Sequence, residues 1–360
     1  MQAWALQQVL KRQGHDVVTI DRQADNLGLL YSSARFAYRA AMKMVGKRKI
    51  PINLEKQFPY IQKNTRKFIA ENIVMSETID STEKLKAHFD REVYDAIVVG
   101  SDQTWRPLYS PNIENFFLDF LGSKNIKRMA YASSFGVDDW EFTEAQTKRC
   151  AELAKQFDAI SVRETSGVDL CQKYFGLEAQ HVLDPTLLLE RKNYEDIYRD
   201  KDIPKRGGVY TYILDRAGWK DQVVDVVKNA LSKPEYTNQP KASLARPSSG
   251  EVEDYKMPAV EAWIRGFSEA DFVVTDSFHG TIFSIIFNKP FISLINSQRG
   301  ASRFYSILGE LGLMSRLISE FKESNVRELV EESINYEHVN CKLLELREES
   351  MSFLMKALSE

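Results

Sequence analysis

The sequence predicts an α/β protein with parallel sheets, and two observations favour this class. Short β-branched strands alternate with helix-like segments along most of the chain. The strands are also apolar on both faces, which is typical of parallel sheets covered by helices on both sides. The three clearest begin with Asp and break into polar residues: Asp95–Gly100, Asp158–Val162 and Asp271–Thr275. Ligands bind beyond the carboxyl ends of such strands, so we expect the functional groups there.

The remaining elements follow from the same periodicity. Further strands are predicted at 17–20, 129–132, 179–183, 209–213 and 291–295. Helices are predicted at 4–12, 282–288, 302–312 and from Asn325 onward. Between Lys233 and Met257, prolines and a glycine interrupt any periodicity, and a loop of this length is usually a lid or disordered.

The length of 360 residues suggests two domains. A boundary is expected at Asp184-Pro185, where a strand ends and the proline prevents a simple helical continuation. We therefore predict an N-terminal domain over residues 1–185 and a C-terminal domain over residues 186–338. A terminal amphipathic helix is expected over residues 339–360.

The composition excludes several classes of protein. With 48 basic and 51 acidic residues the net charge is −3, and 43% hydrophobic residues are too many for long disorder. Three widely spaced cysteines form no metal or disulfide pattern, and no signal peptide is evident, so a cytoplasmic location is expected. The most apolar stretch, 272–295, contains charged residues that exclude a membrane span. The acidic balance disfavours nucleic-acid binding.

One segment, residues 26–69, carries ten basic residues and one acidic residue, a net charge of 10 − 1 = +9. Arg35, Arg39 and Lys43 recur every four residues and form one helical stripe beside an apolar side. One interpretation is a solvated helix face. The other is peripheral contact with an anionic membrane or polymer, and near acidic lipid each basic residue contributes about 1 kcal/mol. The sequence leaves both open.

The clearest candidate for chemistry is the segment 275–281, which leaves a buried strand and begins a helix. Helix N-termini bind phosphate or carboxylate readily. We expect Gly280 to let a ligand approach the backbone, and Ser277 and Thr281 to donate hydrogen bonds to it. His279 can donate a proton or pair with an anion, although a capping histidine is the structural alternative.

Arginines follow two other predicted strands. Arg299 and Arg303 come after the strand at 291–295, next to the histidine segment if consecutive strands are neighbours. Arginine matches phosphate and carboxylate bidentately, but solvated surface is an equal alternative for both. Arg163 follows the strand at 159–162 directly. It is either paired with Glu164 or reserved for an anion, and we favour the anion.

Polar residues end two more strands. Ser101, Asp102 and Gln103 are candidates for binding substrate hydroxyls, with Asp102 as general base, although a helix N-cap would explain them equally well. Ser133 and Ser134 offer further hydroxyl donors, with a structural turn as the alternative. The sequence contains no GxGxxG, GxxxxGK[ST], HExxH or GxSxG motif, and no metal site is predicted.

Taken together, the motifs resemble the polysaccharide pyruvyl transferase family. The segments that carry the resemblance, in the family's order, are Tyr94–Trp105, Ala130–Gly136, Ser161–Gly167, Val182–Thr186 and Asp271–Thr281. The resemblance implies a glycosyltransferase-B-like architecture, two Rossmann-like domains whose parallel sheets face a cleft. It also implies transfer of the pyruvyl group of phosphoenolpyruvate, with no cofactor, to a sugar of a cell-surface polysaccharide or its lipid-linked precursor. The product would be a pyruvyl ketal.

The family's motifs carry roles onto particular residues. His279 and Arg163 match the histidine and arginine expected near phosphoenolpyruvate, with Asp102 or Asp276 as our candidates for the hydroxyl base. Some members have an arginine where this chain has Ser277, and Arg299 or Arg303 is our candidate substitute. Members usually open with a strand before the helix that Met1–Gln7 begins, so the resemblance implies that the first strand is missing here.

Two other functions fit the same residues. A nucleotide-sugar glycosyltransferase would use a similar two-domain cleft and the same anion sites for a diphosphate. A non-catalytic glycan- or membrane-binding protein would need only the basic segment.

Overall fold

The computed structural model describes residues 1–25, 29–46, 51–244, 247–296 and 300–359, and it has an α/β fold built on parallel sheets. The first half contains a four-stranded sheet in the order β3-β4-β5-β6, and a separate parallel pair, β1-β2. The second half contains a five-stranded sheet in the order β11-β10-β9-β7-β8. All described pairs in these sheets are parallel, which confirms the predicted fold class.

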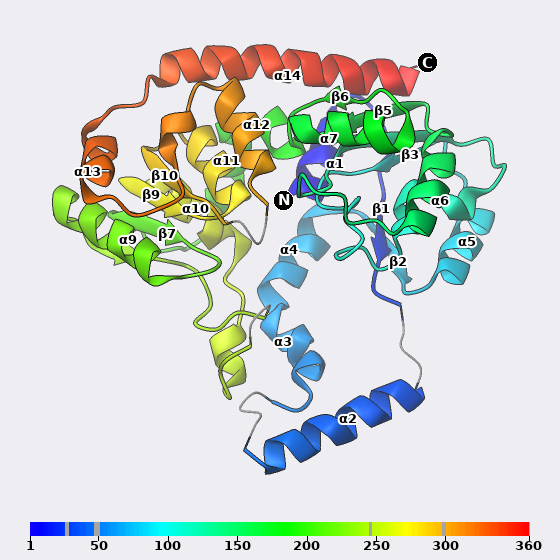
Figure 1. Cartoon of the computed structure of the whole chain (residues 1–360), viewed down its shortest axis with the longest axis horizontal. Coiled ribbons are helices and arrows are strands. Elements are labelled where there is room, and N and C mark those ends of the chain that lie inside the picture. Colours follow the sequence, from blue (N-terminus) through cyan, green and yellow to red (C-terminus); the bar gives the residue numbers. More distant parts are fainter. Residues whose placement is uncertain (26–28, 47–50, 245–246, 297–299, 360) are drawn as a thin grey trace.

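Helices surround both sheets (Figure 1). The elements of the first half are α1 (Gln2–Arg12), β1 (Thr19–Arg22), α2 (Leu29–Met44), α3 (Phe58–Ile61), α4 (Lys63–Asn72), β2 (Met75–Ile79), α5 (Thr82–Arg91), β3 (Ala96–Val99), β4 (Lys127–Ser133), α6 (Glu144–Ala154), β5 (Ala159–Val162), α7 (Thr165–Leu170) and β6 (Gln180–His181). Those of the second half are α8 (Arg191–Tyr198), β7 (Val209–Tyr212), α9 (Gly218–Leu231), β8 (Glu235–Tyr236), α10 (Val260–Glu269), β9 (Phe272–Thr275), α11 (Phe278–Ile286), β10 (Phe291–Leu294), α12 (Ser302–Glu310), β11 (Leu317–Ile318), α13 (Glu323–Glu331) and α14 (Tyr336–Ser359).

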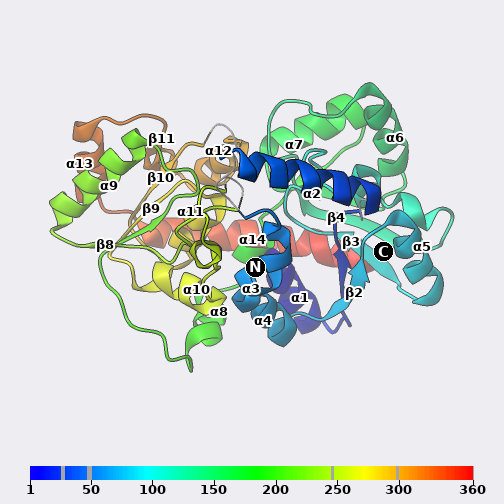
Figure 2. The same ribbon diagram turned by 90° about the horizontal axis from the view of Figure 1, so that it is seen from below.

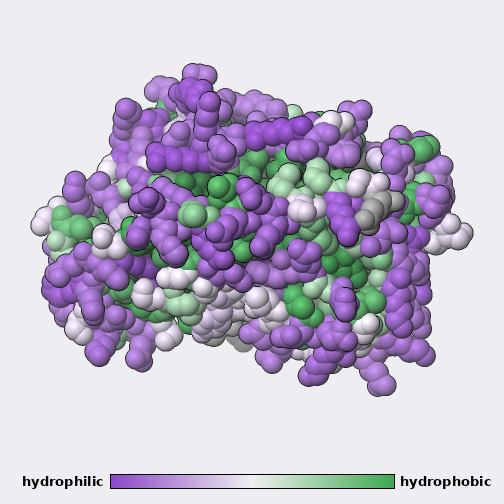
Figure 3. All heavy atoms as spheres, turned by 90° about the horizontal axis from the view of Figure 1, so that it is seen from above, coloured by the Kyte–Doolittle hydropathy of each residue, from purple (hydrophilic) through white to green (hydrophobic). Residues whose placement is uncertain are grey.

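The long helix α14 joins the two halves. It runs along one side of both in Figure 1 and behind both in Figure 2. At one end the Tyr336 hydroxyl donates to the carbonyl of Lys289, and at the other Lys127 Nζ donates to the carbonyl of Leu358 at 3.2 Å. Figure 3 shows this side of the molecule, where hydrophilic side chains predominate and hydrophobic atoms lie in separate patches. None of the helices within the described ranges is long and apolar enough to cross a bilayer.

The structure corrects three predictions of local structure. Strand β6 is shorter than the predicted 179–183, because the Leu183 N–H donates to Ser350 Oγ of α14 at 3.0 Å. Helix α11 begins at Phe278 instead of 282, because Ser277 Oγ accepts from the Gly280 N–H at 3.4 Å and caps the helix earlier. Helix α14 begins at Tyr336, three residues before the predicted start. The predicted domain boundaries themselves stay a prediction.

The loop expected to be a lid or disordered packs onto the first half. Its Ala242 and Tyr255 form a small core with Leu54 and Ile61, and the Met257 N–H donates to the carbonyl of Ile61 at 2.9 Å. The sequence did not indicate this contact, because its apolar residues are sparse and come from distant parts of the chain. The long loop therefore supports the segment between α2 and α4.

Candidate functional site

The carboxyl ends of the two sheets meet, and polar side chains from both halves come together there. His279, which follows β9, places Nε2 at 3.6 Å from Asp184 Oδ2, which follows β6. The guanidinium of Arg163, which follows β5, lies 5.1 Å from the centre of the Phe278 ring. This is the sheet edge at which the sequence predicts function.

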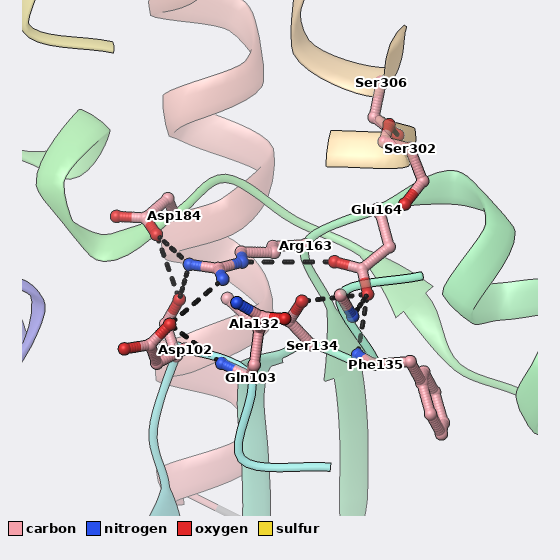
Figure 4. Close-up of polar contacts among 12 residues, drawn as sticks. Asp102, Gln103, Ala132, Ser134, Phe135, Arg163, Glu164, Asp184, Ser302 and Ser306 are labelled. Carbon is pink, nitrogen blue, oxygen red and sulfur yellow. Dashed lines mark hydrogen bonds and ion pairs between the residues drawn. The ribbon is translucent and has the colours of Figure 1, made fainter. Parts of the chain in front are cut away.

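Arg163 is the centre of a carboxylate cluster in the first half (Figure 4). Its side chain is 0% exposed, with Nη1 at 2.9 Å from Asp184 Oδ2 and Nη2 at 3.3 Å from Asp102 Oδ1. Its Nε lies 4.0 Å from Glu164 Oε2. Arg163 is therefore paired mainly with Asp184 and Asp102 and not with Glu164, and its role in binding an anion stays a prediction. Burial alone would lower the pKa of this guanidinium, but the surrounding carboxylates raise it, so Arg163 stays charged.

Asp184 holds several of these groups together. Its Oδ2 also accepts from Ser101 Oγ at 3.0 Å, and its Oδ1 accepts from Thr186 Oγ1 at 2.6 Å. Burial would raise the pKa of this carboxyl, but His279, Arg163 and Thr186 together keep it well below its usual range. In the sequence, Asp184 was recognisable as a domain boundary and as part of the motif Val182–Thr186, but not as a site residue. Its position after a buried strand, like that of Arg163, was the signal that it belongs to the site.

His279 lies in the first turn of α11 and faces the carboxylate cluster. Its side chain is 24% exposed, yet its Nε2 is buried and has no hydrogen-bond partner among the described residues. The alternative of a capping histidine is wrong, because Ser277 supplies the cap of α11. The imidazole is therefore positioned to meet a ligand as well as Asp184.

Arg303, in the first turn of α12, brings a second guanidinium to the same place. It lies 5.4 Å from the Phe278 ring and is 6% exposed, so the alternative of a solvated surface residue is wrong. Burial, together with the nearby charge of Arg163, lowers its pKa to about 10. A bound anion would offset the cost of burying two like charges around one ring. Arg299, the other predicted cation, lies outside the described residues.

Asp102 stands at the exposed edge of the cluster. Its side chain is 60% exposed, and its backbone φ of 140° is strained for a residue other than glycine. The carbonyl of Asp102 accepts from the Ser134 N–H at 3.0 Å, which holds this strained conformation. Desolvation would raise the pKa of Asp102, but Arg163 and His279 lower it, so the carboxylate is ionised and accessible. Strained backbone of this kind concentrates at functional sites.

The other hydroxyl and amide candidates of the first half bond to the protein itself. Ser133 Oγ donates to the carbonyl of Val99 at 3.2 Å, and Ser134 Oγ donates to Glu164 Oε1 at 3.0 Å. Gln103 Oε1 accepts from Arg106 Nη1 at 2.8 Å. The structural alternative is therefore supported for Ser133 and Ser134, and Gln103 bonds to Arg106, whereas Ser101 does join the cluster through Asp184.

Two predicted ligand contacts of the histidine segment have structural explanations. A Cβ on Gly280 would lie 2.1 Å from Thr275 Oγ1, so packing alone already requires glycine at this position. Thr281 Oγ1 lies 2.6 Å from Ser293 Oγ and is fully buried. The sequence does not show which side of the helix start faces the neighbouring strands, and ligand contacts at Gly280 and Thr281 stay predictions.

Asp276 is also bound within the second half. It accepts hydrogen bonds from the N–H groups of Leu214 at 2.6 Å and Asp215 at 3.1 Å, and from Lys220 Nζ at 2.6 Å. The carboxylate is 1% exposed, so these contacts give no support to a role as hydroxyl base.

Buried polar atoms without hydrogen-bond partners gather where the halves meet. Within the described parts of the chain they include Arg163 Nε, Glu164 Oε2, Ser166 Oγ, His279 Nε2 and Ser302 Oγ. An unsatisfied buried group costs about 1–3 kcal/mol, so such a cluster needs an explanation, and a ligand site is one. Ser302 lies above Glu164 in Figure 4. The sequence pattern did not indicate Ser302 or Ser166 as candidate site residues.

The two halves are in direct contact beside this cluster. Ser306 Oγ of α12 accepts from the N–H of Thr165 at 3.0 Å. A Cβ on Gly300 would lie 1.8 Å from the carbonyl oxygen of Gly136, so only glycine allows this approach, and its φ of +83° also favours glycine. The segment around α12 therefore closes one side of the site.

Comparison with known proteins identifies the family. Among solved structures, the chain is similar to the glycotransferase of kitacinnamycin at 12% identity and a TM-score of 0.49, covering 99% of this chain and 95% of that one. It is also similar to a glycosyltransferase from Rickettsia africae ESF-5 at 9% identity and a TM-score of 0.41, covering 96% and 95%. No curated protein matches. The family model for polysaccharide pyruvyl transferase matches residues 1–298, which confirms the resemblance that the motifs indicated. The chain therefore belongs to the polysaccharide pyruvyl transferase family.

Proposed function

We propose that this transferase takes phosphoenolpyruvate as donor and forms a pyruvyl ketal on a sugar of a cell-surface polysaccharide or its lipid-linked precursor. The observation that carries the proposal is the group of unpartnered buried polar atoms between His279 and the first turn of α12. A small anion with several oxygens would satisfy donors from both halves at once. The coarser assignment, a polysaccharide-modifying transferase, follows from the family alone.

The phosphate end of the donor is assigned to α12. This helix begins after Ala301, whose side chain cannot cap its first N–H groups, and nine residues give it an appreciable dipole. Arg303 and the unpartnered Ser302 Oγ lie in the same turn. A phosphate there would bond to N–H groups, a hydroxyl and a guanidinium together.

The reaction would begin with a proton transfer. Protonated His279 gives its Nε2 proton to the methylene carbon of phosphoenolpyruvate, which leaves the adjacent carbon electrophilic. A sugar hydroxyl adds to that carbon and loses its proton. The carbon–oxygen bond to phosphate then breaks, and a second hydroxyl adds and loses its proton. Of the two hydroxyl protons, one is taken up by the departing phosphate and the other restores protonated His279, so the products are the ketal and inorganic phosphate.

Asp102 is the proposed acceptor of a hydroxyl proton. It is ionised and 60% exposed, and its partner Arg163 fixes its position at 3.3 Å. Asp276, the other candidate, is enclosed by protein donors. The cluster around Arg163 would thus serve the acceptor side, while Arg303 serves the donor side.

The direct test measures phosphate released from phosphoenolpyruvate with a proven acceptor. Because general acid–base catalysis contributes about 10²–10⁴-fold, His279→Ala should lose about that much in turnover. His338→Ala, an exposed histidine on α14, is the matched control and should keep wild-type turnover. Wild-type turnover in folded His279→Ala would overturn the assignment.

Ligand-induced stabilisation distinguishes this proposal from the alternative, a nucleotide-sugar glycosyltransferase. Phosphoenolpyruvate at about 100 times its Kd should stabilise the native state by about 2.7 kcal/mol, whereas UDP and GDP should leave Tm unchanged. Stabilisation by a nucleoside diphosphate alone would favour the alternative.

A further inference from the structure

Helix α2 stands apart from both halves of the molecule. It lies at the opposite end from α14 in Figure 1 and in front of the body in Figure 2. Large apolar side chains on it and just after it are exposed: Phe36 by 48%, Tyr38 by 65%, Met44 by 82% and Val45 by 64%. A group of exposed apolar side chains on one helix indicates an interaction surface.

The basic side of α2 is turned partly toward the rest of the protein. Arg39 is 19% exposed, with Nη1 at 2.7 Å from Glu55 Oε1, and Arg35 Nη2 lies 3.5 Å from the same oxygen. Ala37, Ala41 and Met44 lie on the opposite side of the helix at 100° per residue, and all three are exposed. A solvated basic stripe, one of the two interpretations of the sequence, therefore describes only part of this helix. Its apolar side faces outward.

The segment that pairs with α2 is itself held by contacts with the loop before α10. Leu54, which precedes the Glu55 partner of the helix, is buried in the small core with Ile61 and Tyr255. Asn64 Nδ2 donates to the carbonyl of Met257 at 2.8 Å. The helix is thus paired with a segment that the second half holds in place.

We propose that α2 docks the protein on an anionic lipid surface. The apolar side of α2 would enter the interface between headgroups and acyl chains, as interfacial amphipathic helices do. The exposed cations Lys43, Lys56, Lys63 and Arg66 would contact the anionic headgroups.

Charge selects this occupant over a second copy of the chain. Residues 26–69 carry +9 and the remainder carries −3 − 9 = −12. Two copies of the basic segment would repel one another. An anionic surface attracts this segment and repels the rest of the protein, so it also fixes the orientation.

The test is co-sedimentation of the full-length protein with vesicles of phosphatidylcholine, with and without phosphatidylglycerol. The wild type should bind only the anionic vesicles. Binding should weaken strongly between about 0.1 M and 1 M salt, where the Debye length falls from about 10 Å to about 3 Å. Sedimentation that is equal with both vesicle types, or absent with both, overturns the proposal.

Two variants separate the apolar from the electrostatic contribution. The triple variant Tyr38→Ser, Met44→Ser, Val45→Ser should bind at least about tenfold more weakly, because three exposed apolar side chains at or beside the outward side of α2 no longer leave water. Lys43→Gln with Lys63→Gln should bind about 25-fold more weakly, at about fivefold for each cation near the surface.

Matched controls come from the other end of the molecule and from distant surfaces. Leu344→Ser removes a 51% exposed apolar side chain of α14, and Lys148→Gln with Lys192→Gln removes two exposed cations outside the basic segment. Controls that weaken binding as much as the α2 variants do would overturn the proposal. The proposal would also be overturned if the triple variant, with an unchanged circular dichroism spectrum, bound anionic vesicles as tightly as the wild type. A wild-type dimer that the triple variant abolishes, without lipid binding by either, would assign the surface to a second copy instead.

Discussion

Two buried carboxylates at strand ends, Asp276 in the second half and Asp184 in the first, look alike in the sequence but differ in their surroundings. Both are nearly inaccessible to solvent, at 1% and 3% exposure. Asp276 receives two backbone N–H groups and the ammonium of Lys220, all from its own half. Asp184 receives Arg163 and Ser101 from its own half and faces His279 across the junction.

The atoms around the two carboxylates differ in the same way. Among the described residues near Asp184, Arg163 Nε and His279 Nε2 have no hydrogen-bond partners, although both are buried. Lys220 beside Asp276 donates to both the carboxylate and the carbonyl of Asp215 at 3.0 Å. A saturated polar cluster stabilises a fold, whereas a cluster with unsatisfied atoms retains capacity to bind a ligand. The comparison thus assigns structure to Asp276 and function to the surroundings of Asp184.

The largest expected effect on stability is that of Asp276→Asn. Lys220 is 5% exposed, so losing its carboxylate leaves a buried charge without a partner, which costs about 3–5 kcal/mol. Urea denaturation should show this loss, while turnover per folded molecule stays near wild type. Glu323→Gln, which breaks the exposed pair with Arg327, should cost under about 1 kcal/mol. A folded Asp276→Asn protein with greatly reduced turnover would contradict the comparison.

A smaller loss of stability and a larger loss of activity are expected for Asp184→Asn. Arg163 keeps Asp102 at 3.3 Å, so the cost should be about 1–3 kcal/mol. Turnover should fall about tenfold or more, because the carboxylate of residue 184, which positions both Arg163 and His279, is replaced by a neutral amide. Stability and turnover should be measured on the same preparation. Equal stability losses in Asp184→Asn and Asp276→Asn, with turnover unchanged in both, would remove the distinction between the two sites.

The contribution of the ionised Asp184 carboxylate to stability should be measurable from the free energy of unfolding at acid pH. Its pKa is held well below its ordinary value of about 3.9 in the folded protein, so the stability it contributes is complete above about pH 4. That contribution is lost as the pH falls below about 4 toward the folded-state pKa. Asp184→Asn should therefore show a shallower loss of unfolding free energy in this range than the wild type. Asp169→Asn, an exposed residue of α7, controls for the removal of one carboxylate, and an equally shallow loss there would contradict the prediction.

The sequence predicted the sheet edge but not the contacts made there. Strands β3, β5 and β9 were recognisable because β-branched runs begin after an Asp and end in polar residues, and these ends do meet. Which polar residues face the junction depends on helix and loop geometry across the halves. Thr281 and Ser134 turn to neighbouring elements of their own half, and no spacing in the sequence shows this.

For the arginines of the site, too, the sequence predicted the position but not the contacts. Arg163 was expected to bind an anionic ligand, yet it pairs with Asp184, 21 residues later in the chain. That pairing depends on β5 and β6 being neighbours in the sheet, which strand order determines and local pattern does not. Arg303 was a correct candidate for the neighbourhood of His279, because it follows β10, which pairs with β9.

The smallest effects compare two serines at the starts of helices. Ser277 caps α11 through a 3.4 Å bond to the Gly280 N–H, so Ser277→Ala should cost about 0.5–1 kcal/mol, at the low end for a cap because the bond is long. Ser302 Oγ is buried and makes no hydrogen bond to any described residue, so Ser302→Ala removes an unsatisfied buried group and should not lower the free energy of unfolding; a gain of about 1 kcal/mol is expected. Ser302→Ala should instead weaken the binding of phosphoenolpyruvate. In thermal unfolding, the rise in Tm that phosphoenolpyruvate causes should be smaller in Ser302→Ala than in the wild type, and unchanged in Ser277→Ala. The reverse pattern, or equal weakening in both, would show that the unsatisfied hydroxyl of α12 does not mark the phosphate site.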